Sequence, residues 1–445
     1  MPPSADYNRG ALRTFMRKIE MIPSKSDAHR AKICAALSEI TSERKCRIEC
    51  GGTSQDIEAT EKCLSALKEG RTEMYCGESG STLRFLLPVA AALGRDVSFY
   101  TEGRLPKRPL SPLYEELESH GCKLSSKGSS PLTVKGKLKH GTFTIAGDVS
   151  SQYISGLLFA LPLLAGDSRI CIEGRLQSRP YVDMTLETLR RFGIEIRETE
   201  EGFLVRGGQK YEAPETYKVE GDWSNACFWL AAGAFTEGGI AVSGLSAGSL
   251  QGDKEILSVL KKFGADVKIE ETEIVVSPGE LCGIEIDASQ IPDMVPVLAA
   301  AACAARGTTV IKHAERLRLK ESDRLASVTQ LLSDLGADIE ELPDGLVING
   351  KNVCGAGCGI FTDRNNSQSR KDREAAEDST DFDGFPLAGG RADGAGDHRI
   401  VMTAAVASLL CRDKVRITGA DAVKKSYPGF FEDMRALGLD GNIIY

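Results

Sequence analysis

The stretch from Asp222 to Ala232 reads DWSNACFWLAA, a polar opening followed by an apolar segment rich in alanine. Openings of the same kind recur along the 445-residue chain. They begin at Gly80, Ser151, Asp222, Asp293 and Asp397. Successive spacings are 151 − 80 = 71, 222 − 151 = 71, 293 − 222 = 71 and 397 − 293 = 104 residues. A signal that returns at a fixed interval indicates a fold built by internal repetition.

A second signal closes each unit with an amphipathic helix that ends in an apolar residue and a glycine. One copy reads LKKFG from Leu260 to Gly264, and the chain then alternates apolar and polar residues as a strand does. Glycine suits the left-handed turn that follows many helices. The closing glycines are Gly121, Gly193, Gly264, Gly336 and Gly438, at spacings of 72, 71, 72 and 102 residues. Both signals therefore share one repeat.

A shorter first copy opens at Pro23 and closes near Gly70, which brings the number of units to six. The opening helices are apolar on every side, and helices of that kind are buried. The closing helices are amphipathic and belong on the outside, with a sheet completing each unit. We therefore expect an α/β fold of two bodies, each with three units packed around their opening helices.

The last interval is longer than the others by 104 − 71 = 33 residues, and the excess lies between Cys358 and Gly396. The segment from about residue 361 to 390 is polar and poor in large apolar side chains. Such a segment cannot bury enough surface to offset its ordering entropy. We expect a solvated, mobile loop there.

The bulk composition limits the function. A formal net charge of -8 argues against a general nucleic-acid or membrane surface. No apolar run is long enough to span a bilayer, and the N-terminus lacks a signal-peptide pattern. Thirteen scattered cysteines fit a reducing compartment, so we expect a cytoplasmic protein. Cys46/Cys50 and Cys354/Cys358 lack a nearby histidine or second cysteine pair, so we expect no metal site.

Basic residues nevertheless gather at the polar openings and in short loops. They are Lys25, Arg30, Arg84, Arg104, Lys107, Arg108, Arg179, Arg316, Lys320, Arg324, Arg399 and Lys425. A helix N-terminus presents unpaired N–H groups and about half a positive charge, so it binds phosphate or carboxylate. A single serine-rich opening is usually only a helix cap. Because openings that carry cations fall in register with the repeat, we predict one cleft that binds small polyanions.

Nine short motifs, met in order from residue 24 to 428, resemble those of the EPSP synthase family of enolpyruvyl transferases. They are Ser24-Lys25-Ser26 with Arg30, Gly80-Ser81-Thr82 with Arg84, Arg104 with Arg108-Pro109, Ser150-Ser151-Gln152, Ser178-Arg179-Pro180-Tyr181, Pro292-Asp293, Lys320-Glu321-Ser322-Asp323-Arg324, Asp397-His398-Arg399 and Lys425-Ser426-Tyr427-Pro428. The resemblance covers nearly the whole chain, and the Lys-Glu-Ser-Asp-Arg and Asp-His-Arg motifs are its most specific parts.

The resemblance implies a two-domain inside-out α/β barrel, each domain holding three βαβαββ repeats around buried parallel helices. It implies a discontinuous domain of residues 1–22 plus 220–445 and a second domain of residues 23–219. It also implies a monomer that needs no cofactor.

The implied reaction transfers the enolpyruvyl group of phosphoenolpyruvate to the 5-hydroxyl of shikimate 3-phosphate, by addition and elimination, in aromatic amino-acid biosynthesis. By position, shikimate 3-phosphate would be held by Lys25, Ser26, Arg30, Ser150, Ser151, Ser178, Tyr181, Asp293 and Lys320. Phosphoenolpyruvate would be held by Lys25, Gly80, Arg104, Gln152, Arg324, Arg399 and Lys425. The gathered cations fit these substrates, which carry two phosphates and two carboxylates between them.

The resemblance also implies catalytic roles. Asp293 would take the proton of the hydroxyl, and Glu321 would protonate the methylene carbon, with Lys25 and His398 close to the reacting atoms. Neighbouring lysines and arginines lower the pKa of both carboxyls. That effect suits an ionised Asp293 and works against a protonated Glu321.

Two positions depart from the family pattern, because Glu78 and Arg316 each stand where asparagine is common. Two other functions stay open. One is the same-fold transferase that acts on UDP-N-acetylglucosamine, and the other is a non-catalytic anion-binding protein. The first typically carries a reactive cysteine in the loop corresponding to residues 101–110, where this chain has none.

Overall fold

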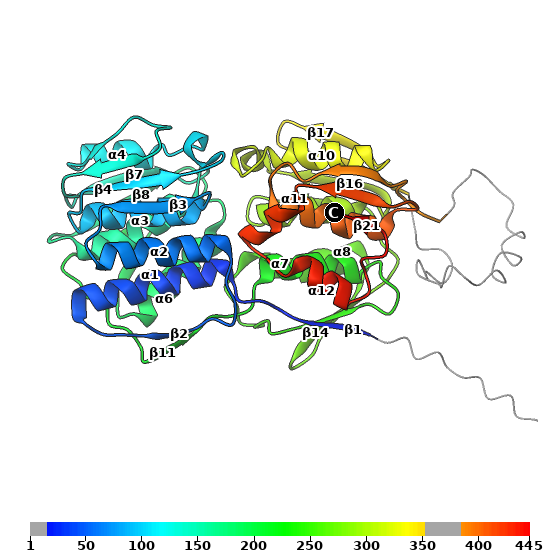
Figure 1. The fold of residues 1–445 in the computed structure, drawn as a ribbon, viewed down its shortest axis with the longest axis horizontal. Helices are drawn as coiled ribbons and strands as arrows, with labels where there is room; N and C mark the ends of the chain where they lie inside the picture. The colour runs from blue at the N-terminus through cyan, green and yellow to red at the C-terminus, as the bar shows by residue number, and fades with distance from the viewer. Residues whose placement is uncertain (1–15, 352–383) are drawn as a thin grey trace, which may run out of the picture.

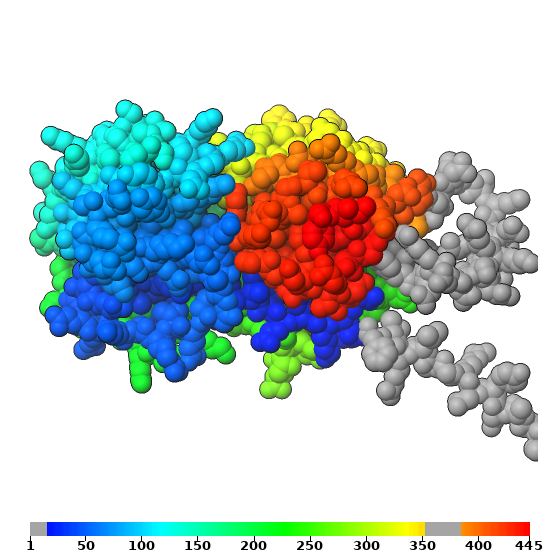
Figure 2. All heavy atoms as spheres, viewed as in Figure 1, coloured from blue at the N-terminus to red at the C-terminus, as the bar shows by residue number. Residues whose placement is uncertain are grey.

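The computed structural model describes residues 16–351 and 384–445, which form two bodies side by side along the long axis (Figure 1). Each body has its own hydrophobic core. One core draws on residues 28–219, and the other on Ile19, Met21 and residues 223–439. A space-filling view shows the two bodies meeting along one seam (Figure 2).

One complete unit shows how the repeat is built. Its elements are β3 (Glu73–Gly77), α3 (Gly80–Ala92), β4 (Val97–Thr101), α4 (Leu113–Ser119), β5 (Lys123–Leu124) and β6 (Leu132–Lys135). β3 pairs with β4 in parallel, whereas β6 lies antiparallel to both β4 and β5, so the sheet order is β3-β4-β6-β5. This is the βαβαββ order that the resemblance implied.

Three further sheets repeat this arrangement of one parallel and two antiparallel pairs. The first is β7 (Thr142–Ala146), β8 (Ser168–Glu173), β10 (Gly202–Val205) and β9 (Ile196–Thr199). The second is β15 (Glu285–Asp287), β16 (Arg306–Lys312), β18 (Gly345–Lys351) and β17 (Asp338–Leu342). The third is β1 (Arg17–Glu20), β12 (Ile240–Ser243), β14 (Glu273–Ser277) and β13 (Asp266–Ile269).

The chain passes between the two bodies twice, at neighbouring points. β1 comes first in the sequence but pairs with β12 of the second body. The return follows β11 (Thr216–Lys218), which pairs in parallel with β2 (Arg47–Glu49) of the first body. Pro23 and Gly221 form an antiparallel bridge where the two passages meet. The last sheet, of β19 (Gly390–Asp393), β20 (Val415–Thr418) and β21 (Ile443–Ile444), completes the second body.

The opening helices lie inside and the closing helices outside, as the sequence predicted. In the described residues the inner helices are α1 (Lys25–Ser42), α3, α5 (Ser151–Ala160), α7 (Trp223–Gly233), α9 (Val295–Ala302) and α11 (His398–Ala407). The outer helices are α2 (Gln55–Lys68), α4, α6 (Arg179–Arg191), α8 (Ile256–Phe263), α10 (Arg324–Asp334) and α12 (Phe430–Ala436). All eleven residues of α7 are buried, whereas α8 buries Leu260 and exposes Lys261.

The closing glycines adopt the predicted left-handed conformation. Gly121, Gly193, Gly264, Gly336 and Gly438 have φ angles of 96, 75, 106, 93 and 67°. At Gly264 the backbone N–H donates to the carbonyl of Leu260, which ends α8 before β13 begins. The repeat read from the sequence is therefore a repeat of backbone geometry.

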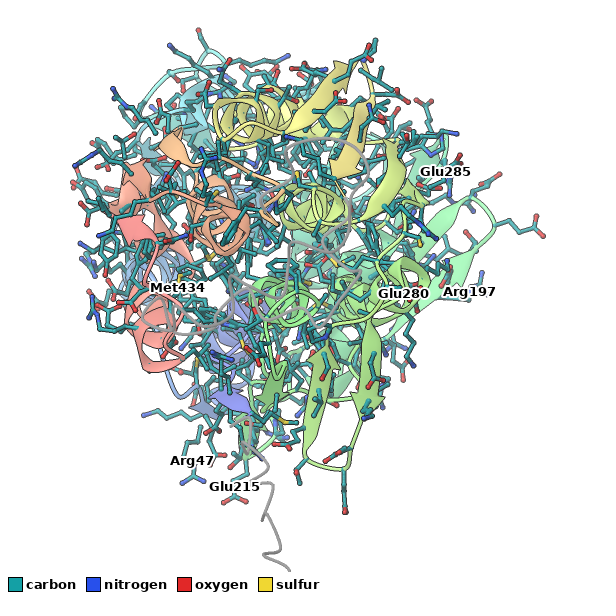
Figure 3. The ribbon with its side chains drawn as sticks, turned by 90° about the vertical axis from the view of Figure 1, so that its right-hand side faces the viewer. Arg47, Arg197, Glu215, Glu280, Glu285 and Met434 are labelled. Atoms are coloured by element: carbon teal, nitrogen blue, oxygen red, sulfur yellow. The ribbon has the colours of Figure 1, made fainter. Side chains whose placement is uncertain are left out.

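Charged side chains cover the outside. Arg47 in β2 and Glu215 just before the neighbouring strand β11 point away from the molecule at its lower edge (Figure 3). No helix within residues 16–351 and 384–445 is long and apolar enough to cross a bilayer. The predicted loop at 361–390 lies largely outside the described residues, and so does the pair Cys354/Cys358.

Candidate active site between the two bodies

Residues at the starts of all six inner helices of the described chain line one cleft. They are Lys25, Gly80, Ser151, Asp222, Asp293 and His398. Five of these starts have a side-chain cap, in which Ser24, Ser79, Ser150, Asp222 and Asp397 accept a backbone N–H of the first turn. The sixth helix, α9, begins through the short 3-10 helix η4 (Pro292–Met294) instead. The predicted convergence of helix openings is confirmed.

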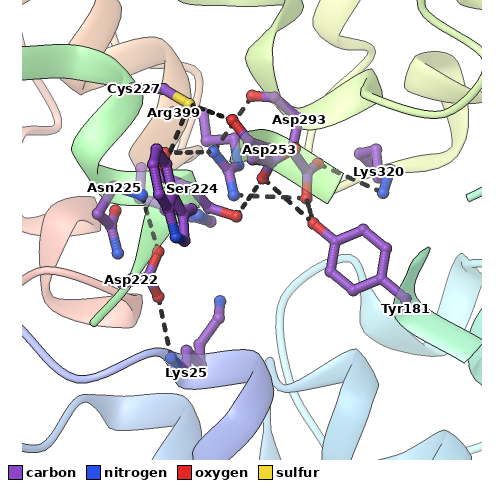
Figure 4. Close-up of polar contacts among 12 residues, drawn as sticks. Lys25, Tyr181, Asp222, Ser224, Asn225, Cys227, Asp253, Asp293, Lys320 and Arg399 are labelled. Atoms are coloured by element: carbon purple, nitrogen blue, oxygen red, sulfur yellow. Dashed lines mark hydrogen bonds and ion pairs between the residues drawn. The ribbon is translucent and has the colours of Figure 1, made fainter. Parts of the chain in front are cut away.

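One cap joins the two bodies. The Oδ1 atom of Asp222 accepts the backbone N–H of Asn225 in α7 at 2.7 Å, and its Oδ2 atom accepts that of Lys25 in α1 at 2.9 Å (Figure 4). A single carboxylate thus satisfies donors of two helices that belong to different cores. Because both helices point their N-termini at this carboxylate, their positive ends lie close together.

The cleft lining is positively charged although the chain is negative overall. Eight basic side chains line it: Lys25, Arg30, Arg84, Arg108, Arg316, Lys320, Arg324 and Arg399. Four acidic side chains line it: Asp56, Asp222, Asp293 and Glu321. The difference, 8 − 4 = +4, contrasts with the chain's net charge of -8. Together with the helix starts, this excess makes the cleft a binding site for anions.

Arg324 holds the acidic side chains of the second body in place. Only 2% of its side chain is exposed. Its Nη1 donates to Asp293 at 2.8 Å, its Nη2 to Glu321 at 2.8 Å and its Nε to Asp397 at 2.7 Å. These carboxylates come from η4, from the segment before α10 and from the cap of α11. One guanidinium therefore fixes the relative positions of three separate elements.

Asp293 has three cations around it, one of which is Arg324. Its Oδ1 lies 3.5 Å from Nζ of Lys320, and its Oδ2 lies 3.3 Å from Nη2 of Arg399. Burial raises the pKa of Asp293, but Arg399, Lys320 and Arg324 outweigh burial and hold that pKa well below 3.8. Asp293 is therefore ionised at neutral pH and free to accept a proton.

Burial and neighbouring cations also have opposite effects on the pKa of Glu321. Burial raises its pKa, while Arg108 and Arg324 lower it well below 4.5. The lowered pKa predicted for both carboxyls is confirmed. Lys320, which is next to Glu321 in the chain, has its pKa lowered by burial to about 8, despite the opposing effect of Asp293.

His398 is a neutral imidazole with unused hydrogen-bonding capacity. Burial, followed by the charge of Lys25, lowers the pKa of His398 to about 3. Neither ring nitrogen has a hydrogen-bond partner among the described residues, since the 3.8 Å approach of Nδ1 to Asp397 is too long for a hydrogen bond. A buried polar group without a partner is costly, so a ligand in the cleft is the natural partner of this ring.

The loop before α3 depends on Gly80. A Cβ atom at this position would lie 2.6 Å from Nη1 of Arg84 and 3.0 Å from Nη1 of Arg108. Arg84 also donates to the side chain of Gln152, which in turn donates to Ser81 at 2.9 Å. Glycine therefore allows two guanidinium groups to approach the first turn of α3.

Several polar contacts bridge the seam. Arg108 of the first body lies 3.2 Å from Glu321 of the second. Glu78, at the start of the loop between β3 and α3, lies 2.7 Å from Lys425. Arg316 donates to the hydroxyl of Ser178 at 3.1 Å. These contacts hold the two bodies against each other around the cleft.

The cleft brings together most residues that the sequence singled out. Those that line it are Lys25, Ser26, Arg30, Gly80, Ser150, Ser151, Gln152, Ser178, Tyr181, Asp293, Lys320, Glu321, Arg324, His398 and Arg399. Arg104 and Lys425 are not among the lining residues. Arg104 is exposed, and Lys425 is paired with Glu78 and the carbonyl of Gly396.

Some lining residues were absent from the predicted substrate-binding set. Arg84, Arg108 and Arg316 line the cleft, although the sequence had marked them only as members of the cation group and of the family motifs or departures, without a substrate-binding role. Arg108 occupies the place expected for Arg104, because the short 3-10 helix η1 (Leu105–Lys107) separates the two and buries Leu105 between them. The motif Arg108-Pro109 was the available signal.

Known proteins resemble this chain in sequence and in fold. The sequence model of the family described as EPSP synthase (3-phosphoshikimate 1-carboxyvinyltransferase) matches residues 14–434. A protein of that name from Clostridium kluyveri is 41% identical over 442 residues, covering 95% of each chain, and one from Clostridium acetobutylicum is 40% identical with the same coverage. The solved EPSP synthase of Acinetobacter baumannii has a TM-score of 0.72 at 24% identity, covering 95% of this chain and 96% of its own.

Proposed function

This chain belongs to the EPSP synthase (3-phosphoshikimate 1-carboxyvinyltransferase) family, and on that premise we propose that both substrates meet in the cleft between its two bodies. The enzyme transfers the enolpyruvyl group of phosphoenolpyruvate to the 5-hydroxyl of shikimate 3-phosphate and releases phosphate. The observation that carries the proposed site is the convergence of six helix starts on a lining with four excess positive charges.

The first body supplies most of the proposed shikimate 3-phosphate site. Lys25, Ser26 and Arg30 lie on the first turns of α1, and Ser150 and Ser151 lie at the start of α5. The rest of the proposed set is Ser178, Tyr181, Asp293 and Lys320. Hydroxyls, backbone N–H groups and ammonium groups suit the phosphate, and the carboxylate of Asp293 suits a ring hydroxyl.

The proposed phosphoenolpyruvate site lies between the two bodies. Arg108 replaces Arg104 in this assignment, beside Lys25, Gly80, Gln152, Arg324 and Arg399. Lys425 remains part of the proposal, because a substrate anion would compete with Glu78 for its ammonium group. Arg84 and Arg316 line the same cleft, and both can pair with anions.

The chemistry needs a base and an acid. We assign the base to Asp293, which is ionised and has the hydroxyl of Tyr181 and three cations around it. We assign the acid to Glu321. In the unliganded cleft Arg108 and Arg324 keep Glu321 ionised, but two bound anionic substrates bring negative charge that raises the proton affinity of the same carboxyl.

The pair Arg104 and Arg108 gives a matched test of the site. We expect Arg108→Ala to raise the KM for phosphoenolpyruvate by about 10-fold to 100-fold, since it removes a charge-assisted contact in a mostly buried place. Arg104→Ala should change that KM by less than about 2-fold, because an exposed arginine contributes little. Steady-state kinetics at saturating shikimate 3-phosphate measure both, and a larger effect from Arg104→Ala would contradict the assignment.

A phosphate-release assay separates this activity from the alternatives. Phosphoenolpyruvate is supplied with shikimate 3-phosphate, with unphosphorylated shikimate or with UDP-N-acetylglucosamine. We expect phosphate only with the first acceptor. Release with UDP-N-acetylglucosamine would support the same-fold transferase. Binding of both substrates without any release would support an anion-binding protein.

The limits of the two domains remain a proposal. We place one domain at residues 1–22 plus 220–445 and the other at residues 23–219, because the two hydrophobic cores divide close to these positions. A monomer in the cytoplasm, with no cofactor, stays the expected state of the enzyme.

A further inference from the structure

A second carboxyl lies behind Asp293. Asp253, in the 3-10 helix η3 (Gly252–Glu255), is only 1% exposed. Its Oδ2 atom lies 3.3 Å from the hydroxyl of Tyr181, and that hydroxyl also lies 3.3 Å from Oδ2 of Asp293 (Figure 4). The hydroxyl of Ser224 donates to the same oxygen of Asp253. Tyr181 thus connects two carboxyls that do not belong to one motif.

Asp253, Tyr181 and Asp293 together have an affinity for one extra proton. A phenol has a single hydrogen, so Tyr181 can donate to only one of the two carboxyls at a time. If both carboxyls are ionised, the contact that lacks the hydrogen places the phenolic oxygen against a carboxylate oxygen, and both of these atoms are acceptors. All the contacts are satisfied once one carboxyl carries a proton. Tyr181 keeps its own hydrogen, because burial and the charges of Asp253 and Asp293 raise its pKa well above 10.

That extra proton belongs on Asp253. Arg399, Lys320 and Arg324 all face Asp293 and favour its ionised form. The groups that face Asp253 are Asp293, Arg399 from α11, Tyr181 from α6, and Asp222, Ser224 and Cys227 from the start of α7. Burial, followed by the charge of Asp293, raises the pKa of Asp253 to about 6 against the opposing effect of Arg399. Its Oδ1 atom has no partner among the described residues, which is less costly for a neutral carboxyl.

We propose that Asp253 stores the proton that Asp293 removes from the substrate hydroxyl, with Tyr181 as the relay between them. This inference rests on the proposed role of Asp293. The hydroxyl proton passes to Oδ2 of Asp293 and then to the oxygen of Tyr181, while the hydrogen of Tyr181 passes to Oδ2 of Asp253. Afterwards Asp293 is ionised, Tyr181 is neutral and Asp253 is a neutral acid.

The proton returns by the same route. When phosphate leaves, the hydrogen of Asp253 passes back to Tyr181, that of Tyr181 to Asp293, and that of Asp293 to the departing phosphate. One proton has then moved from the hydroxyl to the phosphate, and the enzyme regains its starting state. A store is useful here because Asp293 alone binds a proton weakly, whereas Asp253 binds it more strongly.

The relay predicts a particular pH dependence. Asp253 accepts a proton only when it is ionised, so kcat should fall as the pH drops through about 6. We call this fall of kcat at acidic pH the acidic limb of the pH profile. Asp293 cannot cause the acidic limb, because the pKa of Asp293 is far lower. Asp253→Asn keeps the shape and the hydrogen bonds but cannot take a proton. We expect this variant to lose about 10-fold in kcat at pH 7.5 and to lose the limb near pH 6, with both KM values within about 2-fold.

Two further variants make the test specific. Glu220→Gln is the control, because Glu220 is another carboxyl whose pKa burial raises, yet it bonds Ser249 and Gln251 rather than Tyr181. It should keep its kcat and its acidic limb. Tyr181→Phe should also lose the limb, and adding Asp253→Asn to it should lower kcat no further. If Asp253→Asn folds poorly, Tyr181→Phe alone, compared with Glu220→Gln, still tests whether the acidic limb depends on the relay.

The outcomes separate the relay from the site on which it rests. If Asp293→Asn is nearly inactive while Asp253→Asn keeps full kcat and the acidic limb, the relay is wrong and the base assignment stands. If Asp293→Asn keeps its turnover, the site assignment itself fails. Losses that simply multiply in the double variant of Tyr181 and Asp253 would also overturn the relay, because independent residues behave in that way.

Discussion

Asp293→Asn lowers kcat by about 10³-fold and leaves the binding of shikimate 3-phosphate nearly unchanged. Loss of a general base typically costs about 10²-fold to 10⁴-fold. Asparagine keeps the size of the side chain, and its amide oxygen can accept from Arg324 while its amide nitrogen donates to the oxygen of Tyr181. It also removes a negative charge from a place with three cations, so affinity for an anionic substrate does not suffer.

Turnover and affinity are measured separately, by phosphate release and by titration calorimetry with shikimate 3-phosphate. Asp287→Asn is the control, because Asp287 is a half-exposed carboxyl of the same body that pairs with His313. It should match the parent enzyme in both measurements. A loss of affinity with unchanged turnover in Asp293→Asn would refute its role as the base.

Arg324→Met destabilises the protein by about 3–5 kcal/mol and lowers activity by at least about 10²-fold. Removing one partner of a buried ion pair leaves an uncompensated charge, and here Asp293, Glu321 and Asp397 all lose the same partner. The free energy of unfolding is measured in urea. Arg318→Met is the control, since Arg318 pairs with Asp323 and Glu341 at a site that is 29% exposed, and such pairs contribute about 0–1 kcal/mol.

The loss of stability in Arg324→Met depends on pH, and its direction follows from the pKa of Asp397. Despite burial, Arg324 keeps the pKa of Asp397 below 3.8 in the folded protein. A carboxyl with a lowered pKa stabilises the fold above its unfolded value and loses that contribution as the pH falls. The stability difference between Arg324→Met and the parent should therefore be fully present at neutral pH and shrink as the pH falls below about 3.8, the unfolded value. Equal stability of Arg324→Met and Arg318→Met would contradict the role of Arg324.

The fold could be predicted from the sequence because each unit repeats its own local signals. Gly264 adopts the left-handed conformation that its place after LKKF requires, and α7 is buried because its sequence is apolar on every side. These are properties of single segments, which tertiary packing only has to accommodate. The polar openings could be placed for the same reason, since each one precedes a helix that has to be buried.

The parts that could not be predicted depend on side-chain direction and on contacts between units. Arg104 and Arg108 share one loop, and only the turn at η1 decides which guanidinium faces the cleft. Asp253 resembles an ordinary polar residue before an amphipathic helix. Its burial arises because η3 packs against α6 and α7, which lie in different bodies. No local pattern reports such a contact.

A crystal structure with shikimate 3-phosphate and phosphoenolpyruvate bound tests the central claim most directly. The account predicts both phosphates and both carboxylates within hydrogen-bond distance of the inner helix starts and of Lys25, Arg108, Arg324 and Arg399. The 5-hydroxyl should contact Asp293. Substrate anions seated away from those helix starts, with the cleft lining unchanged, would contradict it.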